Sequence, residues 1–453
     1  MSDAATSERG LFGPVLSRGA AFAATTDAAW LQAMLDAEAA LAGAQADAGL
    51  ATVVHAAVVA AACRAEAFDL DALGRDAVDG ANPVIPLVRA LSTAVAAVDP
   101  AAAQLVHRGA TSQDIIDTAA MLVSRAALAA LAGDLRLAVR RAVQLSETHR
   151  HLAMVGRTLG QHAAPITFGL KAAGWTSGLV AAGRRVERAM AELPAVQLGG
   201  AVGTLSVYGR SGPAVLAAFA SRLGLAEPVL PWHTERSRIA ELAGVLGLAA
   251  GAAAKVAGDV VLLAQTEVAE VRDTAASRGG SSAMPHKRNP VAAVSVLAAA
   301  RTVPGEVATL LGSMAHEHER AAGAWHAEWQ PLTTALRSTG SAAAWLVDVL
   351  EHLEPVPVAM AANLARTGGL LYAEAAAAAL APALGRLEAQ RLVEQACTEA
   401  LAGGRQLRAV LGGRPDVTAV LGEAALDAVF SPCSVAGSTD TFIDRALADA
   451  RAF

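Results

Sequence analysis

The chain has 453 residues and a formal net charge of −6, and its basic residues form neither a run nor a stripe with interleaved aromatics, which argues against nucleic acid and anionic membrane as partners. Hydrophobic residues make up 54% of the chain and aromatic residues only 4%, because alanine supplies much of the apolar total. Alanine favours helices and lets them approach closely, so the composition predicts a mostly helical protein.

No stretch without charges reaches the roughly 20 residues of a membrane-spanning helix. The first ten residues contain acids and no apolar segment of the kind that signal peptides carry. Cys63, Cys397 and Cys433 lie far apart without metal-ligand spacing, as free thiols in a reducing compartment do. We therefore expect a cytoplasmic protein.

Three helical domains are expected along the chain. In the first, residues 1–110, Asp27 is expected to cap a helix that runs to about Gly49. The second, residues 111–355, is expected to hold five long helices, roughly at 113–149, 166–192, 236–272, 289–317 and 329–352. The third, residues 356–453, reads as shorter helices broken by glycine pairs. The predicted fold class is all-α with an elongated central bundle of five helices.

The stretch from Gly279 to Pro290, Gly-Gly-Ser-Ser-Ala-Met-Pro-His-Lys-Arg-Asn-Pro, lies between two apolar helical patterns. Glycines permit unusual backbone angles and prolines resist helix, so a loop that can close over a ligand is predicted. A hydroxyl in such a loop can move a proton at carbon, while a cation and an amide hold the charge that develops on a neighbouring carboxylate. A solvated, turn-rich loop is the alternative from the residues alone.

This stretch resembles the signature loop of the fumarase/aspartase superfamily, Gly-Ser-Ser-x-Met-Pro-x-Lys-x-Asn-Pro, at every specified position. The resemblance implies an enzyme that makes or breaks a bond between a heteroatom and the carbon β to a carboxylate, with no cofactor or metal. It also implies a homotetramer in which the central domains form a 20-helix core and three subunits meet at each active site. The catalytic residues that it implies are Ser281, as proton donor to carbon, Lys287 and Asn289.

Residues 107–118, His-Arg-Gly-Ala-Thr-Ser-Gln-Asp-Ile-Ile-Asp-Thr, contain two hydroxyls where a loop becomes a helix. Hydroxyls and free backbone N–H groups at a helix start can hold a carboxylate, although a plain helix cap is the alternative. The stretch resembles the first signature region of adenylosuccinate lyase and of the muconate lactonising enzymes. This resemblance implies that Thr111 and Ser112 bind a substrate carboxylate and that His107 lines the site.

Residues 156–165, Gly-Arg-Thr-Leu-Gly-Gln-His-Ala-Ala-Pro, resemble the second region of the superfamily, where fumarase, argininosuccinate lyase and adenylosuccinate lyase carry a histidine after the threonine. That histidine helps to handle the proton of the leaving group, and Leu159 stands in its place. An amine or hydroxide leaving group needs protonation, whereas a carboxylate, whose acid has a pKa of roughly 4, does not. Leu159 therefore favours a carboxylate as nucleophile and leaving group. In the alternative, His162 or His107 has taken over the acid role.

Residues 232–238 and 316–329 are dense in histidine, arginine and tryptophan. They are similar to the bacterial muconate lactonising enzymes, above all Trp-His-Ala-Glu-Trp at 325–329. Metal binding is an alternative, but the spacing matches no standard helical histidine pair. A substrate with three carboxylates needs several cations. The residues expected to contact substrate are His107, Thr111, Ser112, Gln161, His162, Arg236, Arg238, Arg320 and His326.

The resemblance as a whole implies a cofactor-independent cycloisomerase, an intramolecular lyase that closes 3-carboxy-cis,cis-muconate to 4-carboxymuconolactone in protocatechuate catabolism by the β-ketoadipate pathway. The expected partners are this small tricarboxylate and further copies of the chain. Two alternatives stay open. One is adenylosuccinate lyase or a related β-elimination lyase, against which Leu159 counts. The other is a non-catalytic, crystallin-like relative, against which the intact set of Ser281, Lys287 and Asn289 counts.

Overall fold

The computed structural model describes residues 11–275, 278–280, 283–284, 286–432 and 437–453. Helices dominate these ranges, so the predicted all-α class is confirmed. The chain divides into two compact units, each assembled from three segments. Unit 1 comprises Met1–Leu135, Ala182–Ala254 and Ser295–Trp345, and unit 2 comprises Arg136–Ala181, Lys255–Val294 and Leu346–Phe453. The division into three sequence domains stays a prediction.

Within the described ranges, five helices contribute residues to both units: α7 (Ser112–Thr148), α8 (Phe168–Glu192), α10 (Ser237–Leu263), α11 (Val291–Gly312) and α12 (Ala324–Glu351). They correspond to the five long helices predicted, but three boundaries were wrong. Helix α10 ends at Leu263 rather than 272, because the Leu263 carbonyl accepts the N–H of Glu270 and closes the helix end. Helix α11 ends at Gly312 rather than 317, and α12 begins at Ala324 rather than 329.

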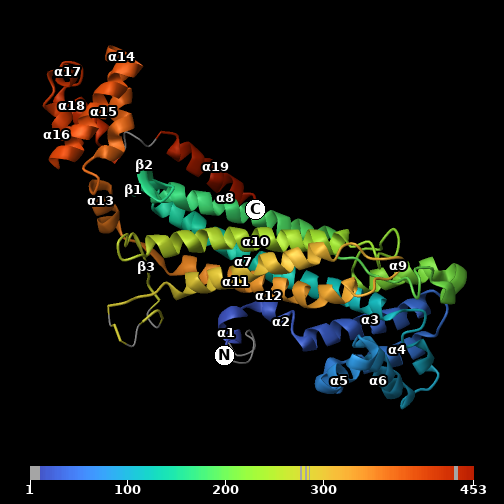
Figure 1. The fold of residues 1–453 in the computed structure, drawn as a ribbon. Helices are drawn as coiled ribbons and strands as arrows, with labels where there is room; N and C mark the ends of the chain where they lie inside the picture. Colours follow the sequence, from blue (N-terminus) through green and yellow to red (C-terminus); the bar gives the residue numbers. More distant parts are fainter. Residues whose placement is uncertain (1–10, 276–277, 281–282, 285, 433–436) are drawn as a thin grey trace. The chain divides into compact units, whose positions relative to one another are not determined.

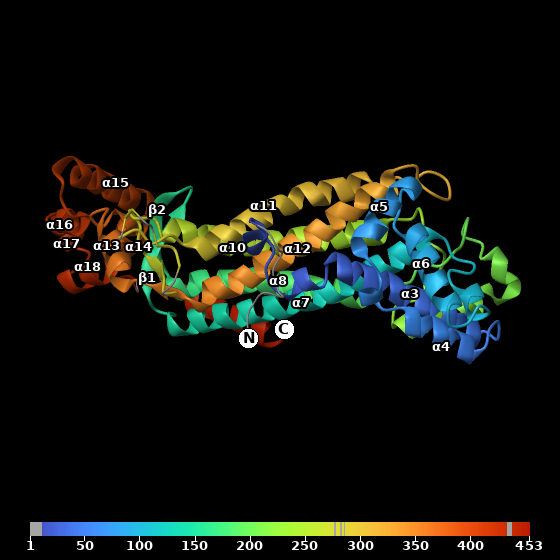
Figure 2. The same ribbon diagram turned by 90° about the horizontal axis from the view of Figure 1, so that it is seen from below.

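Unit 1 also holds the short N-terminal helices and α9, and α3 to α6 lie together in both ribbon views (Figure 1 and Figure 2). Helix α3 begins after Thr26, whose hydroxyl accepts the N–H of Ala29 at 3.2 Å, so Thr26 and not Asp27 is the cap. The bounds are α1 Gly13–Leu16, α2 Ala20–Ala23, α3 Asp27–Asp47, α4 Val53–Ala62, η2 Ala65–Ala67, α5 Leu70–Gly80, α6 Val84–Ala96, η3 Ala102–Leu105, η4 Ser206–Ser211 and α9 Gly212–Leu223.

Unit 2 contains two antiparallel strand pairs that the sequence analysis did not predict. Strand β1 (Ala153–Thr158) pairs with β2 (Gln161–Thr167), and β3 (Val271–Asp273) pairs with β4 (Leu353–Pro355). The first pair contains an irregularity between Val155 and Arg157 and turns at Leu159-Gly160. Its pattern therefore lacks the clean alternation and the Asn-Gly turn that announce a hairpin in a sequence.

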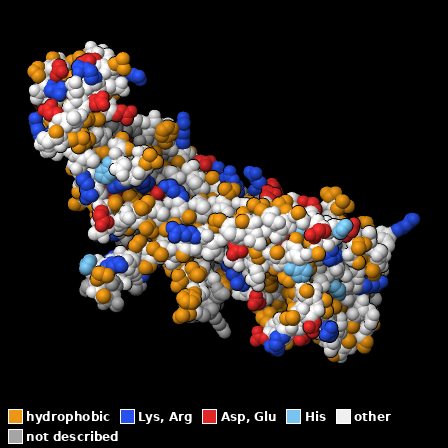
Figure 3. Space-filling view, in the orientation of Figure 1, with side chains coloured by type: hydrophobic (Ala, Val, Ile, Leu, Met, Phe, Trp, Pro, Cys, Tyr) orange, Lys and Arg blue, Asp and Glu red, His pale blue; other side chains and the backbone are white. Residues whose placement is uncertain are grey.

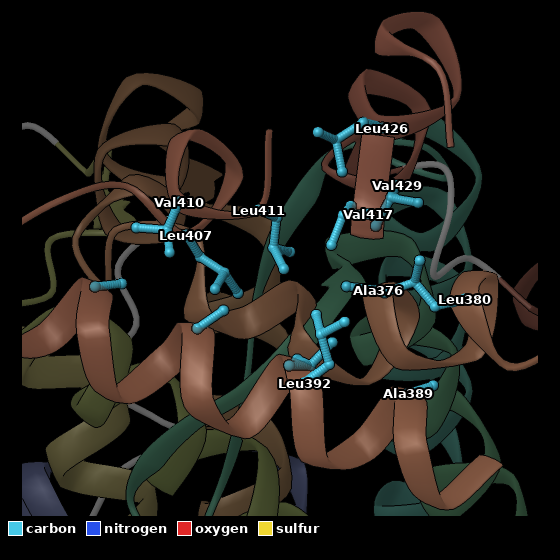
Figure 4. Close-up of a cluster of buried hydrophobic side chains, with 13 residues drawn as sticks. Ala376, Leu380, Ala389, Leu392, Leu407, Val410, Leu411, Val417, Leu426 and Val429 are labelled. Carbon is cyan, nitrogen blue, oxygen red and sulfur yellow. The ribbon is translucent and has the colours of Figure 1, made fainter. Parts of the chain in front are cut away.

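The C-terminal helices of unit 2 pack around an apolar core of their own (Figure 4). Leu392, Leu407 and Leu411 are each at most 2% exposed in this cluster, which spans α14 to α18. The bounds are α13 Pro357–Ala365, η5 Leu370–Tyr372, α14 Ala373–Leu384, α15 Arg386–Gly403, α16 Leu407–Gly412, α17 Pro415–Thr418, α18 Glu423–Val429 and α19 Thr439–Arg451.

Three of the described helices, α7, α10 and α11, are long and apolar enough to cross a membrane by length and composition alone. The apolar window of α7 is 72% buried within the chain, but those of α10 and α11 are only 39% buried. Figure 3 shows hydrophobic side chains on the face along α10 and α11. The exposed apolar residues there are Leu248, Leu262, Val294 and Leu311. Exposed apolar side chains that gather along a helix are typical of an interface.

Candidate active site

The segment that precedes α7 places His107, Thr111 and Ser112 in unit 1. His107 adopts a left-handed backbone conformation with φ of 55°. Its ring Nδ1 lies 2.6 Å from Oε1 of Glu38, and its backbone N–H donates to Oε2 of the same carboxylate at 2.9 Å. Ser112 is the first residue of α7, so both hydroxyls lie where a loop becomes a helix, as the sequence predicted.

Asp114 organises the backbone around Thr111. Its fully buried carboxylate accepts the N–H of Thr111 at 3.0 Å and the N–H groups of Gly199 and Gly200 at 2.9 Å each. Nε2 of His233 lies 2.7 Å from the same carboxylate. Asp114 thus joins the start of α7 to the loop before η4 and to the segment before α10.

Arg236 lies in a buried ionic cluster in unit 1. Its guanidinium donates to both carboxylate oxygens of Asp117, at 2.8 and 3.1 Å, and to both of Glu328, at 3.1 and 2.5 Å. The residue is only 2% exposed. These acids occupy the donors of Arg236, so the cluster gives Arg236 a structural role, and its contact with substrate stays a prediction. Trp325 also donates to Asp117, at 3.1 Å.

The other predicted cations of unit 1 are less enclosed than Arg236. Arg320 donates to Oε1 of Gln113 at 3.1 Å and to the carbonyl of Ala201 at 2.8 Å, which places it beside the start of α7. Arg238 donates to the carbonyl of Leu193, and burial lowers its pKa. His326 is exposed on the first turn of α12. Of the three, Arg320 is the cation that the structure brings to the Thr111 region.

The β1–β2 hairpin carries Leu159, Gln161 and His162 in unit 2. Leu159 and Gly160 form its two-residue turn with φ of 51° and 77°, and the Leu159 side chain is fully exposed. Leucine seldom adopts positive φ. Burial and then the nearby Arg157 lower the pKa of His162, so its ring is neutral at neutral pH and poorly suited to donate a proton. Gln161 is exposed beside the turn.

A buried carboxylate anchors this hairpin close to its turn. Arg157 donates to the two oxygens of Glu270 at 2.8 and 2.9 Å, and the Glu270 side chain is fully buried. The side-chain amide of Asn363 donates to Glu270 at 2.9 Å. The sequence reading did not single out Glu270. In the sequence, Glu270 is an acid within an apolar run, and this run was predicted to be the end of the helix at 236–272.

Lys287 and Asn289 belong to the loop before α11, also in unit 2. Asn289 closes the neck of the loop, because its backbone N–H and its side-chain amide both donate to the Gly279 carbonyl, at 2.8 and 3.2 Å. Gly279 has φ of 76°, and a Cβ there would lie 2.3 Å from the Asn289 carbonyl oxygen, so only glycine fits. Lys287 is exposed. Ser281, the predicted proton donor, lies outside the described residues.

The predicted residues therefore fall into two groups that the structure describes separately. Unit 1 brings together His107, Thr111, Ser112 and Arg320, while unit 2 holds Gln161, His162, Lys287 and Asn289. Glu38 was missed in the first group. Its sequence signal was a single acid on the apolar side of α3, three residues after Leu35 and three before Leu41, both fully buried.

Comparisons with known proteins give a consistent result. The sequence matches the family model described as "Lyase" over residues 16–305 and the model "Adenylosuccinate lyase C-terminus" over residues 369–446. A 3-carboxy-cis,cis-muconate cycloisomerase of Bradyrhizobium diazoefficiens is 45% identical over 438 residues, covering 96% of this chain and 97% of that protein. A nitrosuccinate lyase of Streptomyces davaonensis is 46% identical over 453 residues, covering 98% and 95%. The solved 3-carboxy-cis,cis-muconate lactonizing enzyme from Pseudomonas putida has a TM-score of 0.93 and 40% identity, covering 98% and 99%.

Proposed function

The chain belongs to the lyase family of the fumarase/aspartase superfamily, and on this premise we propose that it is a 3-carboxy-cis,cis-muconate cycloisomerase. The observation that carries the proposal is near-full-length similarity, in sequence and in fold, to enzymes of that name. The chemistry of Leu159 agrees with it. A leucine cannot protonate a leaving group, and lactone formation by a carboxylate requires no such step.

In the proposed reaction, a substrate carboxylate adds to a conjugated double bond and forms the C–O bond of the lactone. Negative charge moves onto a second carboxylate, where Lys287, Thr111 and Ser112 supply a cation and hydrogen-bond donors. Ser281 donates a proton to carbon and regains one from solvent, so the substrate keeps all its atoms and takes up one proton. One amide N–H of Asn289 is engaged with Gly279, which leaves the other for the same charge.

We propose a cytoplasmic homotetramer in which active sites combine residues from three copies of the chain. The exposed face of α10 supports this assembly. Gly244, Gly251 and Gly258 recur there every seven residues, and a Cβ at any of them would meet no atom within 4 Å. A seven-residue repeat of small side chains on a partly exposed helix allows another helix to approach closely. The exposed Leu248 adds apolar surface to the same helix.

A second reaction, elimination from nitrosuccinate, has specific support. The nitrosuccinate lyase of Streptomyces davaonensis resembles this chain as closely as the cycloisomerases do. β-Elimination from nitrosuccinate would break a C–N bond, remove a proton from the adjacent carbon and give fumarate and nitrite. Nitrite is a weakly basic anion, as a carboxylate is, and leaves without protonation. Leu159 therefore excludes neither reaction, although it counts against amine-releasing lyases.

Turnover of the two substrates decides between these reactions. Purified protein is mixed with 3-carboxy-cis,cis-muconate, and the ultraviolet absorbance of the conjugated diene is followed while the lactone is identified as product. Parallel reactions with nitrosuccinate are assayed for nitrite and fumarate. Loss of diene absorbance without nitrite release supports the cycloisomerase. Nitrite release without lactone formation establishes the lyase instead, and turnover of neither substrate overturns both assignments.

The same assay tests the proton donor. Ser281→Ala should lower kcat by about 10²–10⁴-fold, the range expected when a positioned proton-transfer group is lost. Ser282→Ala is the matched control on the neighbouring hydroxyl and should keep most of the activity. Size-exclusion chromatography with light scattering confirms that both variants assemble as the wild type does. A larger loss in Ser282→Ala would move the role to Ser282.

A further inference from the structure

His107 is held by both oxygens of one buried carboxylate. Oε1 of Glu38 lies 2.6 Å from the ring Nδ1, and Oε2 accepts the backbone N–H of the same histidine at 2.9 Å. The Glu38 side chain is fully buried, while the His107 side chain is 19% exposed. Since Nδ1 faces Glu38, the carboxylate keeps a proton on Nδ1 and fixes the orientation of the ring. Nε2 has no hydrogen-bond partner among the residues described.

The surrounding contacts show that this geometry is enforced from two sides. On α3, Gln45 lies two turns after Glu38 and donates through its amide to the carbonyl of Leu105 at 3.0 Å. On the other side, Tyr208 donates to the carbonyl of Arg108. Gly109 has φ of 74°, and a Cβ there would lie 2.7 Å from the Tyr208 ring. The backbone on both sides of His107 is therefore fixed by long-range contacts.

The electrostatics agree with this geometry. Burial alone would lower the pKa of His107, but the hydrogen bond to Glu38 and the charges of Glu38 and Asp114 outweigh it, and the pKa is raised. These acids reach the ring from two elements, Glu38 from α3 and Asp114 from α7. Tyr208 is neutral, because burial raises its pKa, and Arg108 is exposed. A raised pKa means that the ring stays charged to higher pH than a free histidine does.

We propose that Glu38 is a positioning residue that holds His107 as an imidazolium, with its Nε2–H available to a carboxylate of the substrate. Glu38 touches no substrate and acts only through His107. A charged N–H donor binds a carboxylate more strongly than a neutral one does. The reaction steps assigned to the signature loop do not require this pair. The pair instead adds a cation with an oriented N–H donor to the carboxylate site at the start of α7. The proposal rests on the proposed function for its substrate.

Activity profiles of four variants test the pair. Glu38→Gln keeps the shape of the side chain but removes its charge, so the pKa of His107 should fall. Because the active form is the protonated one, the alkaline limb of the kcat/KM profile should move to lower pH. At neutral pH, kcat/KM should fall about tenfold to a hundredfold, mainly through KM, as expected when a charged hydrogen bond to the substrate is lost.

His107→Gln should remove the alkaline limb of the kcat/KM profile. In the double variant, Glu38→Gln should then lower kcat/KM little further, because Glu38 acts through the histidine. Asp47→Asn is the matched control. Asp47 lies on the same helix and accepts a hydrogen bond from Arg222 at 2.6 Å, and none of the contacts described above joins it to His107. It should leave the profile unchanged. Glu38 would have a merely structural role if Glu38→Gln lost stability, kept the alkaline limb in place and lowered kcat/KM equally in the wild type and in His107→Gln.

Histidine NMR tests the charge independently of turnover. With histidine labelled at the ring, the His107 signal is identified by its absence in His107→Gln. Its titration midpoint in the wild type should lie above that of a free histidine and fall in Glu38→Gln. If the NMR result is as expected but neither substrate is turned over, the proposed function is overturned while the proposed Glu38–His107 pair is supported. A wild-type midpoint at or below that of free histidine overturns the pair even if Glu38→Gln does not fold.

Discussion

Arg236, which the sequence predicts as a substrate contact, is enclosed by acids of its own chain. It lies between two buried acids, Asp117 and Glu328, and His316 approaches Glu328 at 3.3 Å. Burial raises the pKa of Glu328, although Arg236 opposes that effect. Taking such charges out of water costs several kcal/mol per ion, which the paired geometry offsets only while every partner is present.

Removal of Arg236 should therefore be costly to stability. Arg236→Gln would leave two carboxylates buried without their cation, and breaking a buried ion pair in this way destabilises by about 3–5 kcal/mol. Urea unfolding followed by circular dichroism measures the loss. Arg391→Gln, which breaks an exposed pair with Glu388, is the control and should change stability little. If Arg236→Gln kept its stability but lost substrate affinity, the original expectation of a substrate contact would be correct.

At the scale of an element, α7 carries an acid beside its buried stripe. Asp134 neighbours the buried Leu131 and Leu135 on this 37-residue helix. Burial raises the pKa of Asp134 to about 6 from 3.8, against an opposing effect of the Arg18 charge. The folded state therefore holds this proton more tightly than the unfolded chain does.

Stability should accordingly depend on pH through Asp134. A raised folded pKa gives a contribution that is complete below the unfolded value of 3.8 and is lost as pH rises through about 6. Asp134→Asn should remove this loss. It should stabilise the protein by about 1–3 kcal/mol at pH 7.5 and have little effect at pH 4, as chemical denaturation at the two pH values would show. An equal effect at both would mean that Asp134 titrates normally.

For the whole molecule, the exposed apolar face of α10 and α11 is the feature that the single chain leaves unexplained. Leu248 on α10 is 56% exposed and Leu311 on α11 is 48% exposed. Association with further copies of the chain would bury such residues, and the proposed tetramer would in this way also complete the proposed shared active sites.

A charge on this face should dissociate the assembly. Leu248→Glu would have to bury a carboxylate at a helix contact, so light scattering should detect smaller species, and turnover should fall with the loss of assembly. Val78→Glu, which places the same charge on the exposed side of α5, is the control, because Val78 is 78% exposed. A Leu248→Glu variant that keeps the mass of the wild type would contradict the proposed use of α10.

The sequence by itself determined the helical class, the five long helices and the loop between α10 and α11, because helix propensity, apolar periodicity and Gly/Pro breaks act within one or two dozen residues. The sequence also showed that Leu159 replaces the proton-handling histidine of related enzymes, and its resemblance to the superfamily predicted the reaction class. It missed the β1–β2 hairpin, since a Leu-Gly turn and an irregular register give no local signal.

Only the tertiary structure decided which charged groups meet. Glu38 and His107 are 69 positions apart in the chain, and Asp114 and His233 are 119 apart. The same folding paired Arg236 with two acids, Asp117 and Glu328, which the sequence did not predict. A local pattern can indicate that a polar residue is buried, but its partner depends on how distant helices pack, because a buried charge is tolerated only where folding brings an opposite charge or a donor to it.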